Sequence, residues 1–188
     1  MKNFRRPDPL FSLCGLNCGL CTMYIGGYCP GCGGGEGNQA CAIARCSLNH
    51  GGVAYCIDCE AYPCEKYQGI ELVDSFILHR NQRKDLEKMK TIGLDAYQKE
   101  LHEKMELLSR LLSDYNDGRR KSFYCLSVNL LEMNDLEDVM KQIEEKTGEM
   151  ELSGKEKAKT AVEAFERKAR SRGILLRLNR KKQTQAEI

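Results

Sequence analysis

The chain reads CGLNCGLC from Cys14 to Cys21, and this run opens a stretch that holds ten of the eleven cysteines and ends at Cys64. Most of the glycines lie in the same stretch, which has few large apolar side chains. Such a segment buries too little apolar surface to offset the conformational entropy lost on folding. A bound metal contributes on the order of 10 kcal/mol of binding energy that is also folding energy. We therefore expect a cysteine-ligated metal module.

The spacing of the cysteines supports this expectation. Three pairs are separated by two residues: Cys18 and Cys21, Cys29 and Cys32, Cys56 and Cys59. A two-residue gap lets a tight turn aim two sulfurs at one ion about 2.3 Å away, while turn amides donate to the thiolates. The run CPGCG from Cys29 to Gly33 has the composition of a zinc knuckle, because proline restricts φ and glycine tolerates a positive φ.

The pattern predicts two zinc ions in closed, structural sites. The predicted ligands are Cys14, Cys18, Cys21, Cys29, Cys32, Cys41, Cys46, Cys56, Cys59 and Cys64. One site would use the pairs Cys18/Cys21 and Cys29/Cys32, and the other Cys56, Cys59 and Cys64 with Cys46 or Cys41. Two tetrahedral sites need eight thiolates. Either two cysteines are spare, or one thiolate bridges two ions, or a cluster is involved. His50 is a further candidate to replace a thiolate, although it also fits a solvated loop.

An iron–sulfur redox protein is the main alternative. Cys14, Cys18 and Cys21 have the three-then-two gap with which radical S-adenosylmethionine enzymes hold a four-iron cluster. In those enzymes the motif follows the first strand of a large α/β barrel, whereas here no run of alternating strands follows. Disulfides conflict with the compartment that the sequence indicates.

That compartment is the cytoplasm. No apolar run reaches the roughly 20 residues that span a bilayer, so no membrane contact is expected. Pro7, Asp8 and Pro9 interrupt the N-terminus where a signal peptide needs continuous apolar residues. The charged fraction of 30% with a net charge of +2 gives no global argument for binding a polyanion.

The rest of the chain has helical periodicity. Residues 94–112 carry apolar side chains at three- and four-residue steps. A helix is expected over 71–90, and either a helix or a strand over 123–131. Asn134 with Glu137, and Ser153 with Glu156, are predicted capping boxes, and Gly173 is a predicted helix end. The predicted fold is mainly α: a small irregular cysteine-rich metal-binding module at 10–68, packed on a helical domain at 69–188.

Two basic segments suggest a second alternative, zinc-knuckle binding of nucleic acid. One is 117–122, which also fits a solvated helix start. The other is 167–182, which ends in Lys181 and Lys182 and contains eight Lys or Arg but no acid. Its stretch 174–178 is expected to be a short strand or an extended tail.

Cys125 fits a buried small apolar side chain. No nucleophile or phosphate-loop signature indicates an enzyme, and a protein partner is compatible with the pattern.

The order of motifs resembles a family of bacterial and archaeal proteins described only as domain of unknown function 3795. The resemblance rests on the ten cysteines of the Cys14–Cys64 stretch, on the run CEAYPCEKY from Cys59 to Tyr67, and on YNDGRRKSFYC from Tyr115 to Cys125. It spans most of the chain. It implies a zinc-binding protein and no particular reaction. Some relatives carry a further cysteine-rich segment at the end, where this chain continues with helices.

Overall fold

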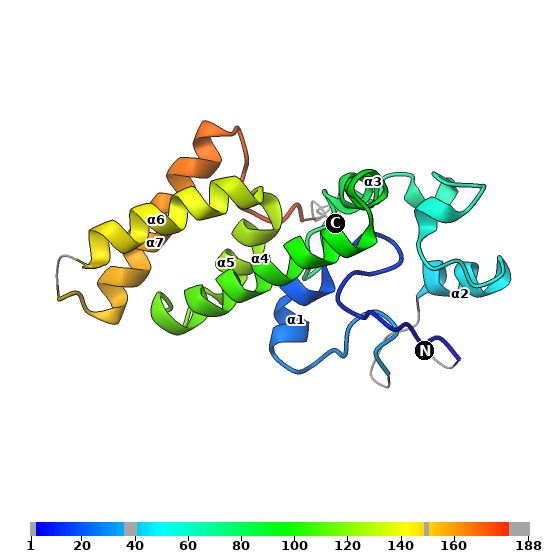
Figure 1. Cartoon of the computed structure of the whole chain (residues 1–188), viewed down its shortest axis with the longest axis horizontal. Helices are drawn as coiled ribbons and strands as arrows, with labels where there is room; N and C mark the ends of the chain where they lie inside the picture. Colours follow the sequence, from blue (N-terminus) through cyan, green and yellow to red (C-terminus); the bar gives the residue numbers. More distant parts are fainter. Residues whose placement is uncertain (1–2, 36–40, 149–150, 181–188) are drawn as a thin grey trace, which may run out of the picture.

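The computed structural model describes residues 3–35, 41–148 and 151–180, and within these ranges the chain is mainly helical and has no β-strand. The predicted mainly-α class is therefore confirmed. The helices are α1 (Thr22–Ile25), α2 (Ala42–Asn49), α3 (Gln82–Ile92), α4 (Leu94–Asp114), α5 (Lys121–Leu130), α6 (Met133–Gly148) and α7 (Gly154–Ser171). Figure 1 shows α6 and α7 paired at one end of an elongated molecule and α2 at the other, with α4 running between them.

The helices α4 and α7 follow the predicted periodicity. In α7, the Glu156 N–H donates to the Ser153 hydroxyl and the Ser153 N–H donates to the Glu156 carboxylate at 2.9 Å, so the predicted capping box is confirmed. Gly173, with φ of +67°, follows the last turn, and the Ile174 N–H donates to the Ala169 carbonyl at 2.8 Å. This closing bond confirms Gly173 as the helix end.

Two helix starts differ from the sequence-based expectations. The predicted helix over 71–90 begins only at Gln82, because the Asp74 carboxylate accepts the N–H groups of His79 and Asn179, both at 2.7 Å, and holds the chain in turns. The predicted cap at Asn134 is also wrong. Helix α6 starts at Met133, so Asn134 lies inside its first turn and leaves Glu137 without a capping role.

The sequence of residues 123–131 was compatible with either a helix or a strand. Residues 123–130 are helical and belong to α5, which ends before Leu131. The stretch 174–178 is an extended tail and not a strand. Its side chains Ile174, Leu176 and Leu178 pack against Leu78, Leu126 and Leu130. The Arg80 guanidinium donates to the Leu175 carbonyl at 3.3 Å and so holds the tail in place.

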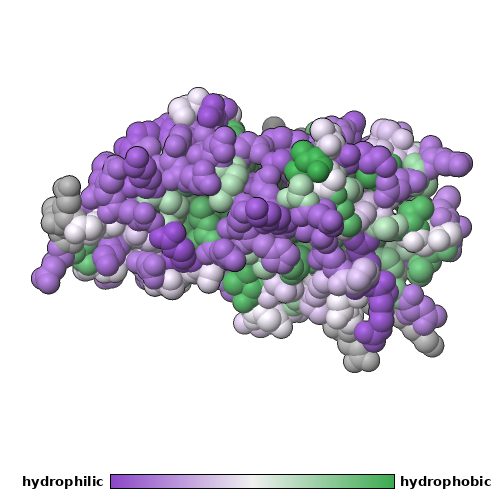
Figure 2. Space-filling model, viewed as in Figure 1, coloured by the Kyte–Doolittle hydropathy of each residue, from purple (hydrophilic) through white to green (hydrophobic). Residues whose placement is uncertain are grey.

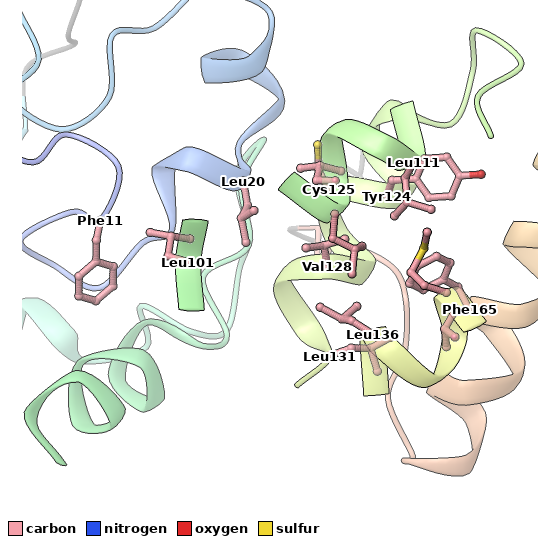
Figure 3. Close-up of a cluster of buried hydrophobic side chains, with 14 of the residues drawn as sticks. Phe11, Leu20, Leu101, Leu111, Tyr124, Cys125, Val128, Leu131, Leu136 and Phe165 are labelled. Atoms are coloured by element: carbon pink, nitrogen blue, oxygen red, sulfur yellow. The ribbon is translucent and has the colours of Figure 1, made fainter. Parts of the chain in front are cut away.

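One hydrophobic core joins the cysteine-rich segment to the helices. Phe11, Leu20 and Tyr67 belong to the same buried cluster as Leu136 and Phe165. Figure 3 shows the helical part of this cluster around Tyr124 and Phe165, with Phe11 and Leu20 facing it from the N-terminal part. The two predicted units therefore share a core, and the division at residue 68 stays a prediction.

The surface is mostly polar. Figure 2 shows hydrophilic side chains over most of the visible face of α6 and α7, with smaller apolar patches between the elements. None of the helices in the described ranges combines the length and apolarity needed to cross a membrane.

Substitution of Phe11 tests whether the cysteine-rich segment and the helices share one core. Its ring is fully buried and lies 4.5 Å from the Tyr97 ring and 5.5 Å from the Tyr55 ring, measured between centroids. Because Phe11→Ala leaves a cavity between the cysteine-rich segment and α4, we expect it to lower the free energy of unfolding by about 3–5 kcal/mol. Leu175→Ala, at a side chain that is 61% exposed, is the control and should change it by less than about 0.5 kcal/mol. Equal losses in urea titrations of both variants would contradict a shared core.

Candidate metal centre

Four cysteines line one small cavity. Cys46 comes from helix α2, and Cys56, Cys59 and Cys64 come from the segment that precedes α3. We call these four residues the outer cluster. The cavity holds about 30 Å³, and the His50 side chain also lines it. A single water needs roughly 10–15 Å³ measured in this way, so the space suits a single ion and is too small for an organic ligand.

Short turns place the three cysteines of the 56–64 segment. A 3₁₀ turn at Cys56–Asp58 ends with the Cys59 N–H donating to the Cys56 carbonyl at 3.0 Å. The Tyr67 N–H donates to the Cys64 carbonyl at 2.9 Å at the start of a second turn. The Cys56 N–H donates to the Leu13 carbonyl at 2.8 Å, which ties the segment to the N-terminal loop. Burial is the main reason why the pKa of the Cys56 thiol is raised to about 12. A hydrogen bond with Tyr67 opposes the shift, and the nearby Cys14, Cys64 and Cys46 thiols add to it.

The remaining cysteines of the stretch form a second group, which we call the inner cluster: Cys14, Cys18, Cys21, Cys29, Cys32 and Cys41. Burial is the main reason why the pKa of Cys18 is raised, and repulsion from the thiols of Cys32, Cys14, Cys21 and Cys29 adds to it. Burial likewise raises the pKa of Cys32 to about 11, and its thiol neighbours are Cys14 and Cys41. Cys14, Cys21, Cys29 and Cys32 are thus close enough to Cys18 for their charges to raise its pKa, and Cys41 acts on Cys32 in the same way.

Cys14 has the most elaborate surroundings of these thiols. It is 7% exposed, and its sulfur lies 3.1 Å from the Ser12 hydroxyl and 3.3 Å from Gln82 Nε2. The Ser12 hydroxyl accepts the Leu16 N–H at 2.7 Å, which leaves its own proton for the sulfur. Hydrogen bonds of this kind onto sulfur orient and stabilise thiolate ligands of metals. Burial nevertheless outweighs them and raises the pKa of Cys14 in the metal-free chain.

Gly15 allows the close approach of Gln82. It has φ of +93°, and a Cβ at this position would lie 2.1 Å from the Gln82 carbonyl oxygen. Only glycine fits this contact between the loop and the start of α3. Gln82 is 1% exposed, and its Oε1 is buried without a hydrogen-bond partner. No motif in the sequence indicated a role for this residue.

A cation lies beside the inner cluster. The Arg6 guanidinium donates to the Phe11 carbonyl at 3.1 Å and to the Ala54 carbonyl, and it stacks 4.6 Å from the centre of the Tyr55 ring. Its charge lowers the pKa of Cys32, against the larger effect of burial. A cation in this place offsets the negative charge of thiolates. Sequence spacing gave no indication of Arg6.

The two clusters meet some requirements of a zinc centre and not others. The donors are thiolates in groups of four or more, and one group surrounds an ion-sized cavity. Across residues 3–35, 41–148 and 151–180, however, no three Cys, His, Asp or Glu side chains are arranged so that they could hold a metal ion. Rotation of the cysteine side chains is needed to bring sulfurs to the 2.3 Å that zinc requires.

A buried polar network fixes the loop that carries Cys14 and Cys18. The Asn17 amide donates to the Asp85 carboxylate at 2.9 Å and to Asn129 Oδ1 at 3.2 Å, and its oxygen accepts the Tyr97 hydroxyl at 3.0 Å. One side chain thereby joins the loop to α3, α4 and α5. Burial raises the pKa of Asp85 to about 7, although the nearby Lys104 opposes the shift.

Several cations of the two basic segments have acidic partners. In the basic segment, Arg172 and Lys168 pair with Asp135 at 2.7 and 3.5 Å, and Arg170 pairs with Glu166 at 3.7 Å. Lys181 and Lys182 lie outside the described residues. In 117–122, the Asp117 carboxylate pairs with Arg120 at 3.1 Å, and α5 starts at Lys121. Cys125 is 5% exposed, as expected for a buried apolar side chain.

Asp85 predicts a pH dependence of stability. Its pKa of about 7 in the folded chain lies above the ordinary value of 3.8 for an aspartate, so the folded state binds a proton more tightly than the unfolded state. The contribution of this proton to the free energy of unfolding is complete below pH 4 and is lost as the pH rises towards 7. The free energy of unfolding then falls by at most about 1.4 kcal/mol per pH unit.

We expect the free energy of unfolding of the Asp85→Asn variant to change less between pH 4 and 7 than that of the wild type. The amide keeps an acceptor for Asn17 and cannot ionise. Parallel pH dependences of the two proteins in urea titrations would show that Asp85 does not titrate in this range.

Comparisons with protein-family models, with curated proteins and with solved structures found no match. The resemblance to domain of unknown function 3795 therefore stays a prediction that rests on the motifs quoted above.

Proposed function

We propose that this chain is a zinc-binding protein in which two ions, held by cysteine thiolates, stabilise a scaffold for interaction with a partner. The observation that supports the proposal is that Cys46, Cys56, Cys59 and Cys64 all line one small cavity of about 30 Å³. These residues come from two segments separated in the sequence, so the fold, and not only local spacing, gathers them.

The chemistry of the donors favours zinc. Four thiolates suit a tetrahedral d¹⁰ ion that needs no open position. A structural role follows, because a closed four-sulfur site leaves no position for water or substrate. In the reducing cytoplasm the thiols are available as ligands and do not form disulfides.

The inner cluster supports a second ion. Its six cysteines exceed the four that one zinc requires, so two of them are spare or a thiolate is shared. Cys14 is the strongest candidate within it, because Ser12 and Gln82 already surround its sulfur with hydrogen-bond partners.

Metal analysis of anaerobically purified protein tests this proposal. We expect a colourless protein with about two zinc ions per chain. A brown sample with absorbance near roughly 400 nm, iron and labile sulfide would instead show that the alternative, a cluster on Cys14, Cys18 and Cys21, is right. A protein that contains neither zinc nor iron and stays folded in a strong chelator would refute both.

Single-site variants test whether the outer cluster binds one of the two ions. Cys59→Ser removes one of the four thiolates that line the cavity, and we expect it to lower the zinc content by about one ion per chain. Cys125→Ala is the control, since Cys125 lies in α5 and is not one of the ten predicted ligands, although the Cys21 thiol lies near enough to add to the effect of burial on its pKa. It should retain the zinc content of the wild type in native mass spectra. Equal zinc content in Cys59→Ser and in the wild type would exclude the outer cluster as a site.

Chelation should unfold only part of the chain. The 41–68 segment consists of the short helix α2 and isolated turns, whereas α4 to α7 are longer regular helices around the main core. We expect metal removal to increase hydrogen exchange in 41–68 while the amides of α4 and α6 keep their protection. Loss of protection in all these helices at once would mean that the metal stabilises the entire fold.

A further inference from the structure

His50 lies next to the outer cluster in a position where it can act on the metal. It is the residue that ends α2, one turn after Cys46, and its Nδ1 lies 3.6 Å from the Cys46 sulfur. The ring lines the same cavity as the four thiols of the outer cluster. None of these features follows from the cysteine pattern.

The backbone after α2 holds the ring at this place. Gly51 and Gly52 have φ of +75° and +73°, and they reverse the chain directly after His50. The Gly52 N–H donates to the Ser47 carbonyl at 2.8 Å, and the Ser47 hydroxyl donates to the Val53 carbonyl at 2.9 Å. The turn therefore fixes the end of the helix where Cys46 and His50 share one face.

The hydrogen bonding of the ring leaves a metal donor available. His50 Nδ1 lies 2.8 Å from the Cys46 carbonyl oxygen, so in the neutral ring the proton sits on Nδ1 and the lone pair on Nε2. Neutral imidazole is a common zinc ligand, and a carbonyl acceptor on its other nitrogen is the usual support for it.

Cys46 differs from the other thiols of the outer cluster in the element that carries it. The other three thiols of the outer cluster come from one segment, 56–64, whereas Cys46 alone comes from α2. Departure of Cys46 leaves three thiolates around the ion, and His50 is the only histidine that lines the cavity.

We propose that His50 is a reserve ligand of the outer zinc site, which takes the place of Cys46 when that thiolate leaves the ion. This inference rests on the proposed function. In such an exchange the Cys46 thiolate would give up its place on the ion and take up a proton from solvent, and the lone pair of His50 Nε2 would occupy that place. The site changes from four sulfurs to three sulfurs and one nitrogen, and keeps its ion.

The test compares zinc content in three variants of the full chain. Cys46→Ala should keep about two zinc ions per chain, because His50 completes the outer site. Cys46→Ala with His50→Ala should lose one of them. Cys46→Ala with His102→Ala is the matched control and should keep both. His102 likewise lies one helical turn after its partner, with Nδ1 2.7 Å from the Gln98 carbonyl, but far in sequence from the outer cluster.

Cobalt provides a second readout. In Cys46→Ala loaded with Co²⁺, the outer site should show the weaker sulfur-to-metal charge transfer of three sulfurs, with d–d bands at higher energy than those of the four-sulfur wild type. Adding imidazole to the double variant Cys46→Ala/His50→Ala should restore the second ion.

Several outcomes would overturn the inference. Loss of the outer ion in Cys46→Ala, with rescue by imidazole, would show that the site accepts nitrogen but that His50 does not supply it. Retention of both ions in Cys46→Ala/His50→Ala would show that another group fills the position. Failure of the proposed function is distinct from these results, because Cys59→Ser would then contain as much zinc as the wild type.

Discussion

The side chain of Asn17 is the constraint on which the rest of the structure depends. Its amide and carbonyl groups bind Asp85 of α3, Tyr97 of α4 and Asn129 of α5, and Asn17 itself is 4% exposed. A buried polar group that loses its partner costs about 1–3 kcal/mol. With all its bonds made, Asn17 therefore has one favourable position, and this position fixes the loop between Cys14 and Cys18 against three helices.

The cysteine-bearing segments differ in how firmly the helical core holds them. The loop of Cys14 is fixed by the helical core, through Asn17 and through the contact of Gly15 with Gln82, whatever binds to its sulfur. The 56–64 segment is held by short turns, by the bond from the Cys56 N–H to the Leu13 carbonyl and by the ion pair of Asp58 with Lys90 of α3 at 2.9 Å, but by no buried polar side chain like Asn17 among the described residues. A metal ion would therefore contribute most to the order of the outer cluster and least to that of the loop.

The sequence correctly predicted two of the three local helix-end features, which depend on neighbouring residues, whereas the cap at Asn134 was wrong. The capping box at Ser153 and the glycine end at Gly173 are set within one helical turn. The start of α3 was not predictable in this way. It depends on Asp74, whose carboxylate accepts the N–H of Asn179, 105 residues further along the chain.

The same limit applies to the candidate site. Spacing identified the ten cysteines but left open whether Cys46 or Cys41 accompanies Cys56. The structure places Cys46 at the outer cavity, whereas Cys41 caps the start of α2 and lies near Cys14 and Cys32. Cys41 and Cys46 lie five residues apart, one at the cap of α2 and the other within the helix. The orientation of α2 therefore decides which of the two cysteines lies at the outer cavity. Arg6 and Gln82 approach the thiols only through tertiary contacts, and no spacing rule finds them.

Charge gives a physical reason for the difference between the two clusters. Four thiolates around a divalent ion leave two negative charges, which are costly where water is excluded. The inner cluster has the Arg6 guanidinium and the hydrogen bonds to Cys14 to offset them. The outer cavity is lined by one cation, Lys66, and by His50. Exchange of one thiolate for an imidazole halves the excess negative charge. The outer cluster has less compensation for the negative charge of four thiolates. A nitrogen ligand in place of one thiolate would therefore lower the electrostatic cost more in the outer cluster than in the inner cluster.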